Sequence, residues 1–100
     1  MPTNIPPRLS QDEIHSALSS LNGWSYEQER NCLIKEFTFK GFYKTMGFVN
    51  AVAFIANKEL HHPDLEVSYN KCVVRYQTHD AGGITVNDIK CAKAIEALEA

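Results

Sequence analysis

The sequence has few of the features that mark several common classes of protein. Its three cysteines, Cys32, Cys72 and Cys91, are odd in number and show no CxxC spacing, which argues against a disulfide framework and a structural zinc site. We therefore expect a reducing compartment, the cytoplasm or alternatively the nucleus. The 10 Lys and Arg residues are outnumbered by 12 Asp and Glu residues, so no basic footprint predicts direct binding to nucleic acid or to an anionic membrane.

Long apolar runs and secretory signals are also missing. The longest apolar stretch, residues 48–56, is far shorter than the roughly 20 residues that span a bilayer. Residues 1–8 contain prolines and no apolar segment of the secretory type, so we expect a loosely ordered tail there. These exclusions leave a small molecule or another protein as the partner.

Capping signals and short alternating runs organise the first part of the chain. Ser10 with Glu13 forms a capping box, which predicts a helix over residues 11–21. Residues 24–26 and 32–39 carry alternating apolar side chains around a polar turn. They are predicted to form two antiparallel strands.

Helical periodicity then replaces alternation. Apolar residues recur at spacings of three and four over residues 42–60, which predicts the main helix covering a sheet. Its predicted inward face comprises Phe42, Met46, Val49, Ala53, Ala56 and Leu60. Gly47 within this stretch indicates close packing against a neighbour, because glycine otherwise weakens a helix. Pro63 forbids continuation, and a second capping box, Thr85 with Asp88, predicts a last helix.

A β-hairpin is expected between these helices. Residues 65–69 and 72–78 both alternate with period two around Asn70-Lys71, which favours a two-residue loop. Tyr69 should then pair with Cys72, and the ladder carried outward would put His62 opposite His79. The parity predicts a core-facing set of Leu65, Val67, Tyr69, Cys72, Val74 and Tyr76, and an opposite set of Glu66, Ser68, Arg75, Gln77 and His79.

The order of elements, α-β-β-α-β-β-α, predicts an α+β fold. We expect a four-stranded antiparallel sheet with three helices on one face, in a single domain over 1–100. Such a sheet has free edges and an uncovered face, and self-association is a common remedy for both.

Three of the four histidines gather around the hairpin: His61 and His62 precede it and His79 follows it. A His-His pair can simply end a helix, where cationic rings suit the negative end of the dipole. Three imidazoles could also hold zinc, although the helical HxxxH spacing is missing. No cysteine belongs to a nucleophile motif. Of the chemical roles, general acid and base catalysis fits best, since imidazole has an unperturbed pKa of about 6.5. The residues by themselves leave this role and the helix-ending role both open.

At these residues the sequence resembles a known family. His61-His62-Pro63, Tyr69-Asn70-Lys71 and Thr78-His79 are similar to the signature of pterin-4a-carbinolamine dehydratase, also known as the dimerization cofactor of a homeodomain transcription factor. The resemblance covers residues 9–98 and includes Gly23-Trp24, Phe37-Thr38-Phe39-Lys40 and Gly47-Phe48.

The resemblance implies the same α+β fold, in tetramers built as dimers of dimers with sheets joined across subunits. It implies dehydration of 4a-hydroxytetrahydropterin to quinonoid dihydropterin, which recycles tetrahydrobiopterin, with no metal and no organic cofactor. His61, His62 and His79 match the family's catalytic histidines. The segments that contact pterin in the family match His61, His62, Pro63, Thr78, His79, Asp80 and Ala81.

The chain departs from the family pattern at three places. Asn57 stands where a Glu is common, Leu60 where an acidic or amide residue is frequent, and Leu65 where an aromatic is frequent. A missing carboxylate could leave a catalytic imidazole less well oriented, so reduced activity is one expectation. Glu59 is an imperfect substitute, because it points roughly 200° around a helix from position 57.

Two functions follow from these features. The first is the pterin dehydratase implied by the three histidines and the resemblance. The second is a non-catalytic protein-binding module that stabilises dimers of a partner such as a transcription factor, an alternative that Asn57 and Leu60 keep open.

Overall fold

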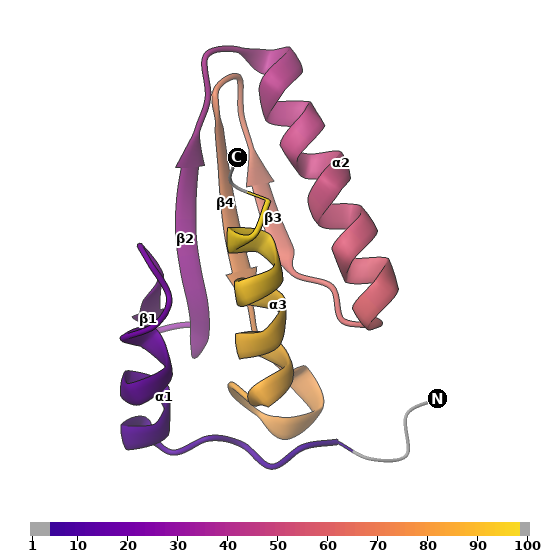
Figure 1. Cartoon of the computed structure of the whole chain (residues 1–100). Helices are drawn as coiled ribbons and strands as arrows, with labels where there is room; N and C mark the ends of the chain where they lie inside the picture. Colours follow the sequence, from indigo (N-terminus) through magenta and orange to yellow (C-terminus); the bar gives the residue numbers. More distant parts are fainter. Residues whose placement is uncertain (1–4, 99–100) are drawn as a thin grey trace.

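The fold is a four-stranded antiparallel sheet with helices packed on one face (Figure 1), as predicted. A computed structural model describes residues 5–98; residues 1–4 of the expected tail lie outside that range. The strand order is β1-β2-β4-β3. The elements are α1 (Gln11–Leu18), β1 (Ser25–Glu27), β2 (Cys32–Thr38), α2 (Phe42–Glu59), β3 (Asp64–Val67), β4 (Lys71–Tyr76), the 3-10 helix η1 (His79–Ala81) and α3 (Val86–Glu96).

Both predicted capping boxes begin helices. Ser10 caps α1 with Glu13, and Thr85 caps α3 with Asp88, each by reciprocal bonds between side chain and backbone. α1 ends at Leu18, earlier than predicted, because the Ser19 and Ser20 hydroxyls donate to the carbonyls of the preceding turn and so compete with further helix. None of the helices in residues 5–98 has the length and apolar character needed to span a bilayer.

The core lies between the sheet and the helices. Cys72, Val74 and Tyr76 of β4 are fully buried against Leu33 of β2 and Ile95 of α3, which confirms the predicted inward face of β4. A fully buried Val, Leu or Ile side chain contributes roughly 1.5 to 3 kcal/mol when moved from water to the interior. Burial of this row fixes β4 in the centre of the sheet.

The predicted inward face of α2 needs correction. The helix buries Thr45, Val52, Ile55 and Ala56, whereas Phe42, Ala53 and Leu60, which were assigned to that face, are exposed. A Cβ added at Gly47 would meet no atom within 4 Å, so the prediction of close packing there is wrong. Thr45 is inside because its hydroxyl proton has two carbonyl acceptors within reach, Gly41 at 2.8 Å and Tyr69 at 3.0 Å.

The hairpin forms with a register two residues away from the prediction. Val67, not Tyr69, pairs with Cys72, and Ser68 N–H donates to the Lys71 carbonyl at 2.9 Å, so Tyr69-Asn70 is the loop. The reason is tertiary: Phe39 N–H donates to the Asn70 carbonyl at 2.8 Å. A shift of two preserves parity, so the inward residues of β4 are unchanged. Val67 and Tyr69, predicted to face the core, are exposed at the end of the sheet.

One end of the molecule collects several chain segments. α2 ends, β3 begins and β4 ends there, and the N-terminal segment passes beneath η1 (Figure 1). Leu9 N–H donates to the Ile84 carbonyl at 2.7 Å, which ties that segment to the start of α3. The chain between β4 and α3 includes η1, and Gly82 takes the left-handed conformation that ends this 3-10 helix, with φ of 72°.

Candidate active site

A cleft of about 680 Å³ opens at this end and brings the three predicted histidines together. His61, His62 and His79 all line it, as do Thr78 and Asp80. Pro63 lies instead on an adjoining groove, and Ala81 lines neither cavity. The remaining walls come from Ile5, Pro6, Glu59, Leu60, Gln77 and Asn87.

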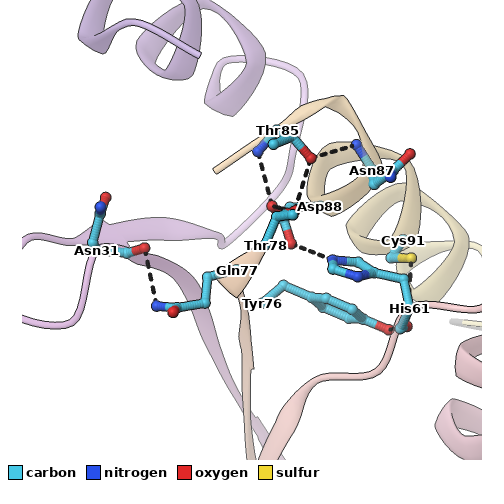
Figure 2. Close-up of polar contacts among 9 residues, drawn as sticks. All are labelled: Asn31, His61, Tyr76, Gln77, Thr78, Thr85, Asn87, Asp88 and Cys91. Carbon is cyan, nitrogen blue, oxygen red and sulfur yellow. Dashed lines mark hydrogen bonds and ion pairs between the residues drawn. The ribbon is translucent and has the colours of Figure 1, made fainter. Parts of the chain in front are cut away.

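The ring of His61 is held firmly. Its Nε2 lies 2.6 Å from Asp88 Oδ1, and the two side chains are 16% and 0% exposed. The ring packs on Tyr76, with centroids 5.2 Å apart. The Tyr76 hydroxyl donates to the His61 carbonyl at 3.1 Å, and His61 N–H donates to the Ala56 carbonyl at 3.0 Å. Both the ring and the backbone of His61 are therefore fixed (Figure 2).

A buried network orients Asp88 in turn (Figure 2). Asp88 Oδ2 accepts the Thr78 hydroxyl at 2.8 Å and the Thr85 N–H at 2.9 Å. Since Thr78 donates its one hydroxyl proton to Asp88, the 2.8 Å contact between the two threonine hydroxyls must run from Thr85 to Thr78. Two donors thus hold one oxygen of Asp88 while its other oxygen faces His61, at a helix N-terminus that favours negative charge.

The rings of His62 and His79 are less constrained than that of His61. Both are exposed, and within residues 5–98 no hydrogen bond or ion pair engages either ring. The observed register, carried outward from Asp64 and Arg75, would put His62 opposite Gln77, so the predicted pairing with His79 is wrong. They still line one cleft, because the chain leaves β4 after Tyr76 and turns into η1 at His79.

Two further carboxylates bear on the departures seen in the sequence. Asn57 lies on the adjoining groove, outside the histidine cleft, whereas Glu59 lines the cleft and pairs with Lys90 at 3.3 Å. Asp88 supplies a carboxylate that contacts the His61 ring, and sequence reasoning missed this contact. The signal was the Thr85 capping box, which identified a capping carboxylate without showing that its second oxygen faced a histidine.

Cysteine chemistry is unfavourable in this structure. Cys32, Cys72 and Cys91 are free and buried. Burial and the neighbouring Glu27 raise the pKa of the Cys32 thiol to about 12, and burial raises the pKa of Cys72 and Cys91 as well. Thiolate nucleophiles are therefore scarce at neutral pH. Within residues 5–98, no three His, Cys, Asp or Glu side chains are grouped to hold a metal ion.

Comparisons with known proteins find relatives of similar sequence. Two curated proteins, both provisionally named pterin-4-alpha-carbinolamine dehydratase, come from Nitrosospira multiformis and Bdellovibrio bacteriovorus. The first is 51% identical over 92% of this chain and 80% of its own length; the second is 48% identical over 94% and 80%.

Two solved structures are also similar. The crystal structure of a transcriptional coactivator/pterin dehydratase from Brucella melitensis has a TM-score of 0.88 and 35% identity, over 93% of this chain and 99% of that one. A pterin dehydratase-like protein, a RuBisCO assembly factor in the alpha-carboxysome, shares the fold with a TM-score of 0.65 and 19% identity, over 77% and 89%.

A family model described as Pterin 4 alpha carbinolamine dehydratase matches residues 7–98. That range contains every element of the fold and each of the three cleft histidines. The chain therefore belongs to the pterin 4 alpha carbinolamine dehydratase family.

Proposed function

We propose that the protein converts 4a-hydroxytetrahydropterin to quinonoid dihydropterin and water by histidine acid-base catalysis, and so recycles tetrahydrobiopterin. The observation that carries this proposal is the cleft lined by His61, His62 and His79, in which a buried carboxylate orients one ring. Family membership supports the choice of a pterin as substrate.

The reaction needs two proton transfers and no change of oxidation state. The bond from C4a to the hydroxyl oxygen breaks, the N5 proton leaves, and a C4a=N5 double bond forms as water departs. One group must therefore give a proton to the leaving oxygen while another takes a proton from N5. Imidazole can perform either task near neutral pH, and positioned transfers of this kind contribute about 10²- to 10⁴-fold each.

Asp88 suggests how the tasks divide. Because Nε2 of His61 faces Asp88 Oδ1 at 2.6 Å, the neutral ring carries its proton there, and Nδ1 is left to accept another. The carboxylate also stabilises the imidazolium that forms, as in other Asp-His pairs. We assign His61 as the base and one of the exposed rings, His62 or His79, as the acid.

The remaining predicted contacts fall into two groups. The hydroxyl of Thr78 is committed to Asp88, so we assign Thr78 a positioning role in addition to lining the cleft. Asp80 lines the cleft and Pro63 the adjoining groove. Both remain proposed substrate contacts, as does Ala81, and no organic cofactor or metal is required by the proposed steps.

The direct experiment is a dehydration assay with 4a-hydroxytetrahydropterin generated in situ and purified protein. We expect loss of the carbinolamine to accelerate in proportion to protein concentration, well above the spontaneous rate. A rate equal to the spontaneous one, with protein whose melting curve shows it to be folded, would defeat the dehydratase proposal.

A protein-binding role is the second candidate, and the outer face of α2 favours it. Tyr43 is 91% exposed and Phe54 is 69% exposed on α2, and aromatic side chains are enriched at protein–protein interfaces. The solved relative named as a transcriptional coactivator/pterin dehydratase is consistent with such a role. An exposed aromatic face of this kind suits either a partner protein or further copies of the chain.

We propose that copies of this chain associate as dimers or tetramers. The outer strands β1 and β3 each have one neighbour in the sheet, so their free edges are available for pairing. Sedimentation of the wild type and of Phe54→Asp tests both routes. A dimer or tetramer that Phe54→Asp dissociates implicates α2, one that it leaves intact implicates the strand edges, and a monomeric wild type contradicts the proposal.

A further inference from the structure

Asn31 connects two distant parts of the chain. It ends the turn between β1 and β2 with φ of 53°, in the left-handed region that asparagine tolerates better than most residues. Its Nδ2 donates to the Gly82 carbonyl at 2.7 Å, across 51 positions of sequence, and its Oδ1 accepts the Tyr26 hydroxyl at 2.6 Å. Because a backbone carbonyl can only accept, the amide must present its NH₂ group to Gly82. Both ends of this amide therefore have defined partners.

Gly82 belongs to a short lobe, residues 78–83, that carries His79. Thr78 N–H donates to the Gly83 carbonyl at 2.8 Å, and Gly83 N–H donates back to the Thr78 carbonyl at 3.3 Å. These two bonds close the lobe at its base. Within it, Gly82 N–H donates to the His79 carbonyl at 3.0 Å, while the carbonyl of Gly82 is held from the β1–β2 turn.

The lobe alone determines where His79 lies. The side chain is exposed and lines the histidine cleft, and among the residues that the structure describes none bonds to or pairs with its ring. The 3-10 helix in the lobe has only three residues, and such short helices have few internal bonds to stiffen them. Support from outside the lobe is therefore needed to hold His79 in place.

Two further features show that the β1–β2 turn and the lobe fit closely. Gln77, which directly precedes the lobe, donates from Nε2 to the Arg30 carbonyl at 2.6 Å and to the Asn31 carbonyl at 3.3 Å (Figure 2). A Cβ added at Gly83 would lie 2.6 Å from Arg8 Cδ and 3.0 Å from Asn31 Nδ2. Glycine at this position thus allows both side chains to approach the lobe.

We propose that Asn31 is a positioning residue, which holds His79 at the cleft by tying the β1–β2 turn to the lobe. The inference rests on the proposed function, because it takes His79 to act on the pterin. No residue of the turn, 28–31, lines the histidine cleft. Asn31 can therefore influence the reaction only through the groups that it holds.

Asn31→Gly is the variant that isolates the side chain. Glycine keeps the left-handed backbone and the carbonyl that Gln77 binds. We expect kcat to fall by about tenfold and KM to stay within about threefold, since misplacing a reacting group can cost up to about 10²-fold. Hydrogen exchange of the Ala81 and Gly82 amides, which bond within the lobe, should become about tenfold faster. The Ser68 amide in the distant hairpin should keep its wild-type rate.

A double-mutant cycle tests the link to His79. If Asn31 acts through that ring, Asn31→Gly should lower kcat by about tenfold in the wild type and by less than about twofold in His79→Ala. A merely stabilising role would lower the melting temperature in both backgrounds without this coupling in kcat. Gln28→Gly is the matched control, because it removes an exposed amide side chain from the same turn, and it should leave kcat and the exchange rates unchanged.

Tyr26→Phe is a gentler second variant. It removes only the hydroxyl that orients the Asn31 amide, so it should change kcat and exchange at Gly82 in the same directions by smaller factors. It carries the same cycle with His79→Ala if Asn31→Gly does not fold.

The inference is overturned if folded Asn31→Gly keeps the wild-type kcat, if its loss of kcat is equally large in His79→Ala, or if Ala81 and Gly82 exchange at their wild-type rates. Hydrogen exchange also separates this inference from the proposed function. If the wild type dehydrates no carbinolamine, the dehydratase proposal fails and exchange alone decides: faster exchange in Asn31→Gly supports the hold on the lobe, and wild-type exchange overturns it.

Discussion

Two polar clusters flank β4. One pairs its charged groups with one another, and the other includes an imidazole that lines the cleft. The Arg75 cluster lies on the open face of the sheet, where the guanidinium pairs with Glu27 at 2.8 Å and Glu66 at 2.7 Å. The Asp88 cluster, formed by His61, Thr78, Thr85 and Asp88, lies at the end of the strand beside the cleft.

The Arg75 cluster satisfies its charges internally. Hydrogen bonds to Glu66 and Glu27 raise the pKa of Arg75, and Arg75 lowers the pKa of both carboxylates. None of its members titrates near neutral pH. In the Asp88 cluster one member is the His61 imidazole, which has one nitrogen on Asp88. Its other nitrogen has no hydrogen-bond partner within residues 5–98. The comparison teaches that only the Asp88 cluster presents an imidazole to a cleft, which is what the proposed catalysis requires.

The largest effect should come from removing the cleft imidazoles. Of His61→Ala, His62→Ala and His79→Ala, at least one should lower kcat by about 10²- to 10⁴-fold while the protein stays folded. His61→Ala should also lower the free energy of unfolding by about 1 to 3 kcal/mol, because buried Asp88 loses a donor. Steady-state kinetics and thermal melts check both.

The three variants also separate catalysis from structure. His62→Ala and His79→Ala remove exposed rings and should change stability by less than about 0.5 kcal/mol. Three variants with wild-type turnover would rule out the shared-site mechanism. Three that unfold would instead support the structural interpretation, in which the His-His pair only ends the helix.

Asp88→Asn should have the next largest effect. The amide replaces one acceptor oxygen of the carboxylate by a donor, so we expect a loss of about 1 to 3 kcal/mol in the free energy of unfolding. The His61 tautomer also loses its anchor, and kcat should fall by about tenfold or more. Asp64→Asn, an exposed change on β3, is the control and should leave both values near the wild type. Unchanged kcat in folded Asp88→Asn would contradict the positioning role.

Sequence and structure agree best where the signal is local. The capping boxes at Ser10 and Thr85 and the alternation in β4 predicted elements that the structure confirms. The hairpin register was missed because the Asn70 carbonyl is bound by Phe39 N–H. That contact crosses from another strand and has no local signature.

The sequence predicted the three histidines of the cleft, but it did not predict that Asp88 holds one of them. His61, His62 and His79 were identified from residue type, position and the family resemblance, and all line one cleft. The link from His61 to Asp88 spans 27 positions and depends on how α3 packs beside the end of α2. Capping explained Asp88 fully at the level of sequence, so nothing there indicated its second partner.

Asn57→Glu should have a smaller effect, in the direction of higher activity. Asn57 lies on the groove that also contains His62, so a carboxylate there can hydrogen-bond or pair with an imidazolium ring in the site. Because His61 already has Asp88, we expect kcat equal to the wild type or raised by no more than about tenfold. A fall in kcat with an unchanged melting temperature would show that Asn57 itself contributes to the site.

Arg75→Met should have the smallest effect on activity and is the test of the other cluster. The pKa values of Glu27 and Glu66 are lowered in the folded state, so their stabilising effect is present above the unfolded pKa and is lost as pH falls through the folded pKa. The melting temperature of the wild type should thus decline more between about pH 7 and about pH 3.5 than that of Arg75→Met. At neutral pH kcat should be unchanged, and a large loss of kcat would implicate the open face in the reaction.

The most direct measurement is a crystal structure with an unreactive 7,8-dihydropterin bound. We expect the pterin ring in the histidine cleft, with a nitrogen of His61, His62 or His79 within hydrogen-bond reach of its C4a–N5 edge, about 2.6 to 3.2 Å or through one water. A pterin bound on the open face beside Arg75, or one that leaves all three histidines beyond that reach, would contradict the account.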